Sequence, residues 1–376
     1  YLYRGQYAMD HGGDPTAEFE KAADSYGKAM RIFPSYSPAH SNLGLVFWNL
    51  GLYAMNTGKD PRRSMEKAIE NFQNAVRLNP KNAYGYNSMG TAYGTLGSYA
   101  IQNGKDPTQL LEKSISSFEK VISIKPDWPY PYNNMGLGYM DKAKYAILAG
   151  QNPSAHLLQA EERFQRALKM NPEYADAHIN LGAAYVLAAQ NYLDQEESPL
   201  EALRRARDAL GNATRLVPDF FPALLQQAEA ALIEIESRMR VNKLPDAVLD
   251  TTFRLLQKAS ASNPQDAQVH RATADFYRLL SIRKRSQGKD IEHEIGEGLT
   301  AVEKALAIHP TLAEAHALRG IFCLLQVDST RDSSRKSEAL AHAKEAFRRA
   351  LQINLLLQRK YHSELQRLGI KDTPHL

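Results

Sequence analysis

The sequence predicts an all-α protein, a superhelical solenoid of antiparallel helix pairs. Two observations predict it: prolines recur every 46 residues in two registers, and small residues recur with the same period between them. A fixed period of 20 to 50 residues is typical of stacked supersecondary units. The first proline series is Pro15, Pro61, Pro107, Pro153, Pro199 and Pro245, and the second is Pro34, Pro80, Pro126, Pro172, Pro218, Pro264 and Pro310.

The first proline series predicts helix starts. The residues before these prolines are short and polar in the first five units, namely Asp14, Asp60, Asp106, Asn152 and Ser198. Such a side chain can accept a hydrogen bond from a free backbone N–H, and proline suits the first helical position because its missing N–H would have no partner there. The second series follows a helix end. The pattern therefore predicts one helix from Pro38 to Gly58 and another from Pro61 to Leu78.

Small and large residues alternate between the two helices of each predicted pair. The first helices carry Gly44, Gly90, Gly136, Gly182, Ala228, Ala274 and Gly320 at one position. The second helices carry Tyr26, Phe72, Phe118, Phe164, Leu210, Leu256, Val302 and Phe347 at another. We expect the small residues to bring the two backbones together and the large ones to fill the space beside them.

The segment "GKDP" at 58–61 and 104–107 could suggest a phosphate-binding loop. That loop requires Gly-x4-Gly-Lys followed by Ser or Thr, after a strand. Here Asp follows the Lys, no strand is expected, and the segment recurs with the repeat. It therefore predicts a boundary between two helices.

These positions together resemble the tetratricopeptide repeat (TPR) family. "AHSNLGLVFWNLG" at 39–51 and "AIENFQNAVRLNP" at 68–80 resemble its two helix signatures, and "AHINLGAAY" at 177–185 and "AEERFQRALKMNP" at 160–172 repeat them. The resemblance covers essentially the whole chain and implies a TPR-like α-α superhelix. The units have 46 residues where the family usually has 34, which implies longer helices.

The register divides the chain into a TPR-like array over 1–355 and a C-terminal capping helix with a tail over 356–376. A terminal repeat needs such a cap because its outer apolar face has no neighbour. The expected units are a partial first unit at 1–34, then 35–80, 81–126, 127–172, 173–218, 219–264, 265–310 and 311–355.

The long unit also resembles arrays that follow the kinase domains of bacterial eukaryotic-like Ser/Thr kinases. This resemblance implies a larger signalling protein, and the start at Tyr1 suggests that a preceding part is missing. No kinase motif occurs in the sequence itself. The single cysteine, Cys323, and the lack of an apolar run near 20 residues lead us to expect a cytoplasmic protein without membrane insertion.

Neither composition nor motifs favour an enzyme, a cofactor, a metal or nucleic acid. The net charge is +4, with acids and bases mixed. His40, His178, His270 and His316 share one repeat position, so they lie about 10 Å apart and predict packing rather than a metal site. We expect Cys323 to be buried and inert, and Trp128 to pack at a unit junction. The run Arg283-Lys284-Arg285 favours a solvated helix end over an anion-binding site.

We expect a protein or peptide ligand along the concave face formed by the first helices. The candidate groove residues are Asn42, Trp48, Asn49, Asn87, Asn133, Asn134, Asn180, Gln226, Arg271 and Arg278. Some TPR proteins hold extended peptides with an asparagine ladder, and Asn42, Asn134 and Asn180 match its positions. An amide can pair with any peptide backbone, because it offers both a donor and an acceptor. The other interpretation, that these asparagines bond neighbouring helices, stays open.

The alternative function is assembly of two copies. We expect apolar residues to line the later part of the groove, namely Leu225, Leu232, Ile233, Ile321, Leu324 and Leu325. An exposed apolar surface of several hundred Å² usually marks an interface. This surface could form a homodimer that pairs attached catalytic domains.

Overall fold

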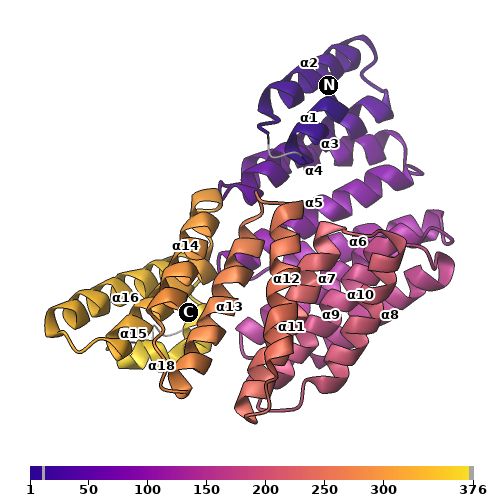
Figure 1. Cartoon of the computed structure of the whole chain (residues 1–376). Coiled ribbons are helices and arrows are strands. Elements are labelled where there is room, and N and C mark those ends of the chain that lie inside the picture. Colours follow the sequence, from indigo (N-terminus) through magenta and orange to yellow (C-terminus); the bar gives the residue numbers. More distant parts are fainter. Residues whose placement is uncertain (11–12, 372–376) are drawn as a thin grey trace. The chain divides into compact units, whose positions relative to one another are not determined.

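The computed structural model describes residues 1–10 and 13–371, and the regular secondary structure of this part is helical throughout (Figure 1). The all-α solenoid of helix pairs is therefore confirmed. The helices are α1 Leu2–Asp10, α2 Thr16–Ile32, α3 Ser37–Asn56, α4 Arg62–Leu78, α5 Ala83–Gln102, α6 Thr108–Ile124, α7 Pro129–Leu148, α8 Ser154–Met170, α9 Ala175–Asp194, α10 Leu200–Leu216, α11 Phe221–Arg240, α12 Asp246–Ser262, α13 Ala267–Ser286, α14 Glu292–Ile308, α15 Ala313–Ser329, α16 Ser333–Ile353, α17 Leu357–Lys360 and α18 His362–Arg367.

The chain packs as two compact units. Unit 1 comprises 1–101, 105–145 and 152–172, within the described residues. Unit 2 comprises 102–104, 146–151 and the described residues from 173 onward. The sequence did not predict this division, because the repeat continues in register across it. The eight repeat boundaries stay a prediction.

The helix boundaries follow the predicted chemistry. The side chains of Asp14, Asp60, Asp106 and Asn152 each accept a hydrogen bond from the backbone N–H two residues later, at 2.8 or 2.9 Å. Just before these caps, Gly58 and Gly104 have φ angles of 71° and 64°, a left-handed conformation that suits glycine and ends the preceding helix. The "GKDP" segments are thus helix boundaries, as predicted.

The predicted packing of large against small residues is confirmed. A Cβ atom on Gly44 would lie 2.5 Å from the ring of Phe72, and a Cβ on Gly90 would lie 2.8 Å from the ring of Phe118. Both phenylalanines are buried. These glycines are therefore required because a neighbouring ring occupies the space of a side chain.

The histidines at the repeated position hydrogen-bond to the turn that joins two successive repeats. His40, His270 and His316 each place Nε2 2.9 to 3.1 Å from the carbonyl oxygen of the proline six residues earlier. Tyr132 donates its hydroxyl proton to Pro126 at 3.4 Å in the same way. The packing interpretation of these three histidines is confirmed.

The basic run at the end of α13 is paired within the chain. Arg283 contacts Asp246 at 2.7 Å, Lys284 contacts Glu294 at 2.5 Å, and Arg285 contacts Asp328 at 2.6 Å. The run is therefore a structural link between helices rather than only a solvated helix end. Cys323 is buried, and burial raises the pKa of its thiol, as expected of an inert cysteine.

The C-terminal segment forms two short helices, α17 and α18, where one capping helix was expected. Its buried residues Leu357, Tyr361, Leu365 and Leu368 share one apolar core with α15 and α16. Residues 372–376 of the predicted capping helix and tail lie outside the described residues. The segment therefore covers an apolar face of the last long helix pair.

Candidate functional site

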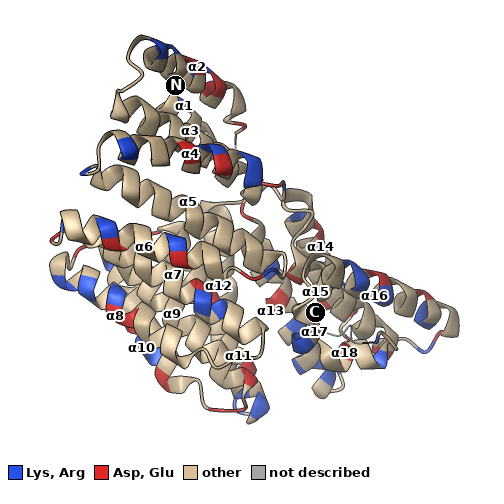
Figure 2. Ribbon diagram, turned by 180° about the vertical axis from the view of Figure 1, so that it is seen from behind, with Lys and Arg blue, Asp and Glu red and all other residues tan. Residues whose placement is uncertain are grey.

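The first helices of the early pairs lack charged residues. Within the described chain, α3 and α5 contain no Lys, Arg, Asp or Glu, whereas α4 and α6 carry both signs (Figure 2). The second helices α4 and α6 therefore present the solvated charge of unit 1. The polar side chains of α3, α5 and α7 serve other contacts.

These polar side chains bond successive first helices to one another. Trp48 Nε1 donates to Thr95 Oγ1 at 3.2 Å, and Asn134 Nδ2 donates to Asn87 Oδ1 at 3.2 Å. The Ser98 hydroxyl donates to the Asp141 carboxylate. We call these six residues the polar row of unit 1.

The predicted asparagines divide into accessible and buried ones. Asn42, Asn87, Asn134 and Asn180 are half-buried, so part of each side chain reaches solvent. Asn49 and Asn133 are buried, with 1% and 3% exposure, and Asn49 Nδ2 donates to Leu45 O of its own helix at 2.8 Å. The expectation that all of them face a groove is therefore wrong for Asn49 and Asn133, because burial removes them from a ligand's reach.

Unit 2 has an ionic row in the corresponding place. Glu229 and Glu236 of α11 pair with Arg271 and Arg278 of α13, the second pair at 3.0 Å. The Asp275 carboxylate also contacts Arg278, at 2.5 Å. These five side chains retain 17 to 28% exposure, so they line a surface that water reaches.

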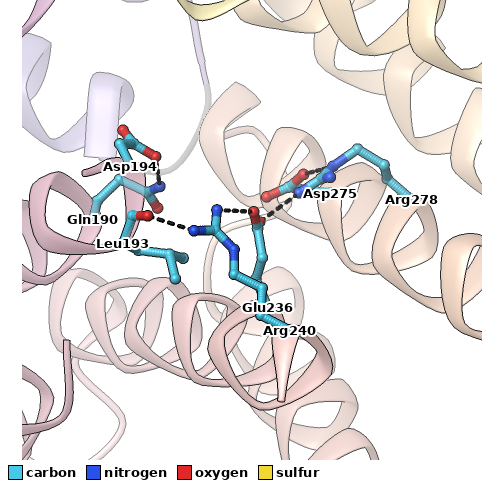
Figure 3. A network of polar contacts seen from close by, with 7 residues as sticks. All are labelled: Gln190, Leu193, Asp194, Glu236, Arg240, Asp275 and Arg278. Carbon is cyan, nitrogen blue, oxygen red and sulfur yellow. Dashed lines mark hydrogen bonds and ion pairs between the residues drawn. The ribbon is translucent and has the colours of Figure 1, made fainter. Parts of the chain in front are cut away.

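Arg240 extends the ionic row to α9, as Figure 3 shows. Its Nη1 donates to the Leu193 carbonyl oxygen at 2.5 Å, and its Nη2 contacts Glu236 at 3.2 Å. One continuous set of contacts therefore runs from α9 through α11 to α13. The ionic row of unit 2 consists of Glu229, Glu236, Arg240, Arg271, Asp275 and Arg278.

Burial is the main influence on the pKa of the Glu229 carboxyl. Burial raises its pKa, and repulsion from Asp275 acts in the same direction, while Arg271 only partly offsets them. Burial also acts to raise the pKa of Asp275, but Arg278 outweighs it and the net pKa is lowered. At Asp194, burial raises the pKa against the hydrogen bond from Gln190. Burial therefore holds the pKa values of both Glu229 and Asp194 above their ordinary values.

The later apolar residues do not line a groove. Leu232, Ile233, Leu324 and Leu325 have 3 to 6% exposure. Leu232 belongs to the core of α11, α12 and α13, and Leu324 belongs to the core that the C-terminal segment completes. The expected apolar surface is therefore wrong for these four residues, because they fill the spaces between helices, whereas Leu225 and Ile321 are half-buried.

Trp128 lies in an aromatic cluster that the sequence only partly indicated. Its ring contacts Tyr84 and Tyr130 edge to face, with centroids 4.9 and 5.4 Å away. The two tyrosines are 62% and 43% exposed, so the half-buried Trp128 packs against surface residues rather than in a core. The Lys125 ammonium lies 5.2 Å from the Trp128 ring centroid. Tyr84 and Tyr130 share one repeat position, which was the available signal.

An open groove of about 770 Å³ lies on unit 1 beside α4, α5 and α6. Its lining includes Met89, Tyr86 and Tyr93, together with the cations Arg77 and Lys113. Lys113 already lies over the Tyr93 ring, at 5.6 Å. The groove does not include the polar row.

Two features of other protein classes are absent from the described residues. No helix there has the length and apolarity needed to cross a membrane. In the same part of the chain, no three His, Cys, Asp or Glu side chains are grouped so that they could hold a metal ion.

Comparison with known proteins supports a TPR array. Residues 64–97 match a family described as TPR repeat. No curated protein matches the chain. A monomeric mutant of IFIT1 with m7Gppp-AAAA is 15% identical with a TM-score of 0.57, and the match covers 96% of this chain and 70% of that one.

Two further solved structures carry the family description. A tetratricopeptide repeat protein from Parabacteroides merdae is 15% identical with a TM-score of 0.48, covering 86% of this chain and 98% of that one. A TPR protein of Thermus thermophilus is 17% identical with a TM-score of 0.43, covering 65% and 98%. At such identities the likeness concerns the fold alone. The fold is a TPR-like solenoid, the class whose helix signatures the sequence resembles.

Proposed function

We propose that this protein is a scaffold that binds an extended polypeptide segment along the first helices of unit 1. The observation that carries the proposal is the half-exposed Asn87–Asn134 pair. A primary amide can form up to four hydrogen bonds. The Asn134 amide forms two of these hydrogen bonds, one that it donates to Asn87 and one that it accepts from Asn133. One N–H and one lone pair remain, which are the groups that a peptide unit requires.

The chemistry of the polar row implies a loose sequence preference. Amide and hydroxyl groups recognise the peptide backbone, which is common to all sequences. Asn42 is half-buried at the same repeat position as Asn134, so it extends the same kind of surface within unit 1, and Asn180 offers a half-buried amide at this repeat position in unit 2. Gln226, Arg271 and Arg278 stay candidate polar and charged contacts of unit 2.

Replacement of Asn134 and Asn180 by Ala tests this function. The full chain would be probed against an array of unstructured peptides, and the affinity of the best binders measured by fluorescence anisotropy. Each lost hydrogen bond should weaken binding about fivefold, because one such bond contributes about 1 kcal/mol. Asn212→Ala is the matched control, since Asn212 is an exposed asparagine on the second helix α10 and should leave affinity unchanged.

The structural alternative makes the opposite prediction for the same variants. Asn134 bonds α7 to α5, so it contributes to the contact between these helices. A sharp fall in melting temperature with unchanged peptide affinity would show that the polar row only holds the helices together.

The ligand-binding scaffold would serve a larger bacterial signalling protein such as a Ser/Thr kinase. What supports this is the resemblance of the 46-residue unit to arrays that follow kinase domains. Mass measurement of the native polypeptide tests it, because the proposal requires a chain substantially longer than 376 residues.

The homodimer through the later groove is not proposed, because Leu232, Leu324 and Leu325, which were to form its surface, are buried. Such a dimer would require them to leave their cores, exposing apolar area at about 25 cal/mol per Å².

A further inference from the structure

The segment 357–368 occupies a helix-binding seat in unit 2. Leu357, Tyr361, Leu365 and Leu368 have 1 to 7% exposure, and their spacing of four, four and three residues is the spacing that would share one face of a continuous helix. They pack with Ala317 and other residues of α15 and α16. The seat is therefore an apolar surface shaped for one amphipathic helical segment.

The present occupant is short and broken. The two helices α17 and α18 have four and six residues, and helices of this length are not stable in water without tertiary contacts. Most of the polar residues between the buried positions are exposed, including Arg359 and Lys360. The structure of this segment therefore depends on the seat, while the seat is formed by longer helices.

The electrostatic surroundings of the seat complement a cation at the position of Lys360. Its side chain interacts electrostatically with Asp275 and Glu314, and also with Asp194 across the ionic row. The Lys360 ammonium is exposed and lies 5.5 Å from the centroid of the Tyr361 ring, and Tyr361 fills the apolar side of the same seat.

Asp328 makes two ion pairs at one end of the seat, and one of them involves the segment 357–368. Asp328 at the end of α15 contacts Arg367 of α18 and Arg285 of α13. Side-chain exposure is 41% for Arg367 and 48% for Arg285, so both contacts are open to water. Solvated ion pairs are weak, so the contact with Arg367 holds the segment without locking it.

We propose that this seat is a docking site for an amphipathic helix of a partner protein, and that residues 357–368 are its exchangeable internal occupant. The partner helix has the pattern Leu-x-x-Lys-Tyr-x-x-x-Leu-x-x-Leu, with Arg able to replace Lys. Its leucines and tyrosine take the apolar seat, and its cation meets the carboxylates around the ionic row. The proposal rests on the proposed scaffold function and adds a second, helix-specific site to it.

The test uses the full chain and a fluorescein-labelled synthetic peptide of residues 354–371. In the variant Leu365→Asp with Leu368→Asp, the internal segment should leave the seat because buried unpaired charges are costly. We expect this variant to bind the peptide at least tenfold more tightly than the unaltered chain, in which the internal segment competes. A peptide with Lys360→Glu and Tyr361→Ala should lose that binding.

Two further variants keep the test decisive. If the double variant fails to fold by circular dichroism, Asp328→Asn should still raise peptide affinity, because it weakens only the closing contacts with Arg367 and Arg285. Glu338→Gln removes one negative charge from an exposed site on α16 and should change nothing. Equal peptide affinity in Asp328→Asn and Glu338→Gln would overturn the proposal.

The outcomes separate this site from the peptide-binding row. Asn134→Ala with Asn180→Ala should leave binding of the 354–371 peptide unchanged, even if it abolishes binding of extended peptides. Peptides of the stated pattern with other residues at the x positions should bind the released seat, and their Lys-to-Glu versions should not. A requirement for the native x residues, or dimerisation of the released variant in sedimentation, would overturn the partner-helix proposal in favour of self-exchange.

Discussion

Gly136→Ala should destabilise unit 1 although alanine is the better helix former. Gly136 lies in α7, and an added Cβ would stand 2.5 Å from Cε1 and 2.7 Å from Cδ1 of Phe164 in α8. Carbon atoms normally approach to about 3.5 Å, so the contact is short by about 1 Å. Phe164 is fully buried, and its ring cannot turn away into solvent.

The magnitude follows from two opposing effects. Overpacking of a filled core costs about 1 to 3 kcal/mol, and replacing Gly by Ala within a helix gains about 1 kcal/mol. We expect a net loss of about 1 kcal/mol. Gly211→Ala in α10 is the matched control, because nothing lies within 4 Å of the added Cβ, so only the gain of about 1 kcal/mol remains.

Urea denaturation followed by circular dichroism measures both variants. Repeat arrays need not unfold in one step, so the midpoint and the slope should both be compared. The two substitutions are chemically identical, yet they should move the midpoint in opposite directions. Stabilisation by Gly136→Ala equal to that of Gly211→Ala would refute the packing of large residues against small ones.

Three further perturbations test local features. Glu196→Gly should raise stability by about 0.5 kcal/mol in thermal melts. Glu196 has a φ of 61°, a left-handed conformation in which other repeats have glycine at this position. Asp106→Ala should lower it by about 1 kcal/mol through loss of the cap on Thr108 N–H, a loss that Asp106→Asn should largely avoid. Burial acts to raise the pKa of Asp328, but hydrogen bonds from Arg367 and Arg285 outweigh it and the net pKa is lowered. A carboxylate with a lowered pKa stabilises the fold above its unfolded pKa of about 3.9, and this contribution disappears as pH falls through the folded value. Asp328→Asn should therefore cost about 1 kcal/mol at pH 7, and equal effects at pH 7 and at about pH 3 would contradict this.

Features governed by neighbouring residues could be predicted from the sequence. The cap of Asp60 depends on the backbone two residues later, and the left-handed Gly58 precedes it by two residues. The contact of Gly44 with Phe72 spans 28 positions, but it repeats in every unit, and the repetition revealed it. The 46-residue period therefore predicted the packing within a repeat, because the same small and large positions recur along the chain.

Features that depend on how far neighbouring helices bury a side chain could not be predicted from the repeat position alone. Leu232 and Leu324 share their repeat position with Trp48 and Arg278, and the register alone does not show which neighbours cover them. The partners of Arg271 and Arg278 were also missed, because Glu229 and Glu236 lie 42 residues earlier rather than 46. A search for opposite charges at that offset would have found both pairs. It would also have shown that ion pairs join α11 to α13 in unit 2, whereas an amide pair joins α5 to α7 in unit 1.

The most direct test of the central claim is to locate a bound peptide by site-specific photo-crosslinking. The photoreactive residue p-benzoylphenylalanine would replace Thr91 beside the polar row, Tyr84 in the aromatic cluster, or Glu119 on the solvated side of α6, one at a time. Each full-length variant would then be irradiated with an extended peptide selected from the array, and the cross-linked product measured by mass spectrometry. The account predicts a cross-link from position 91 and little from positions 84 and 119. A peptide that cross-links to position 84 or 119 and not to position 91 would contradict it.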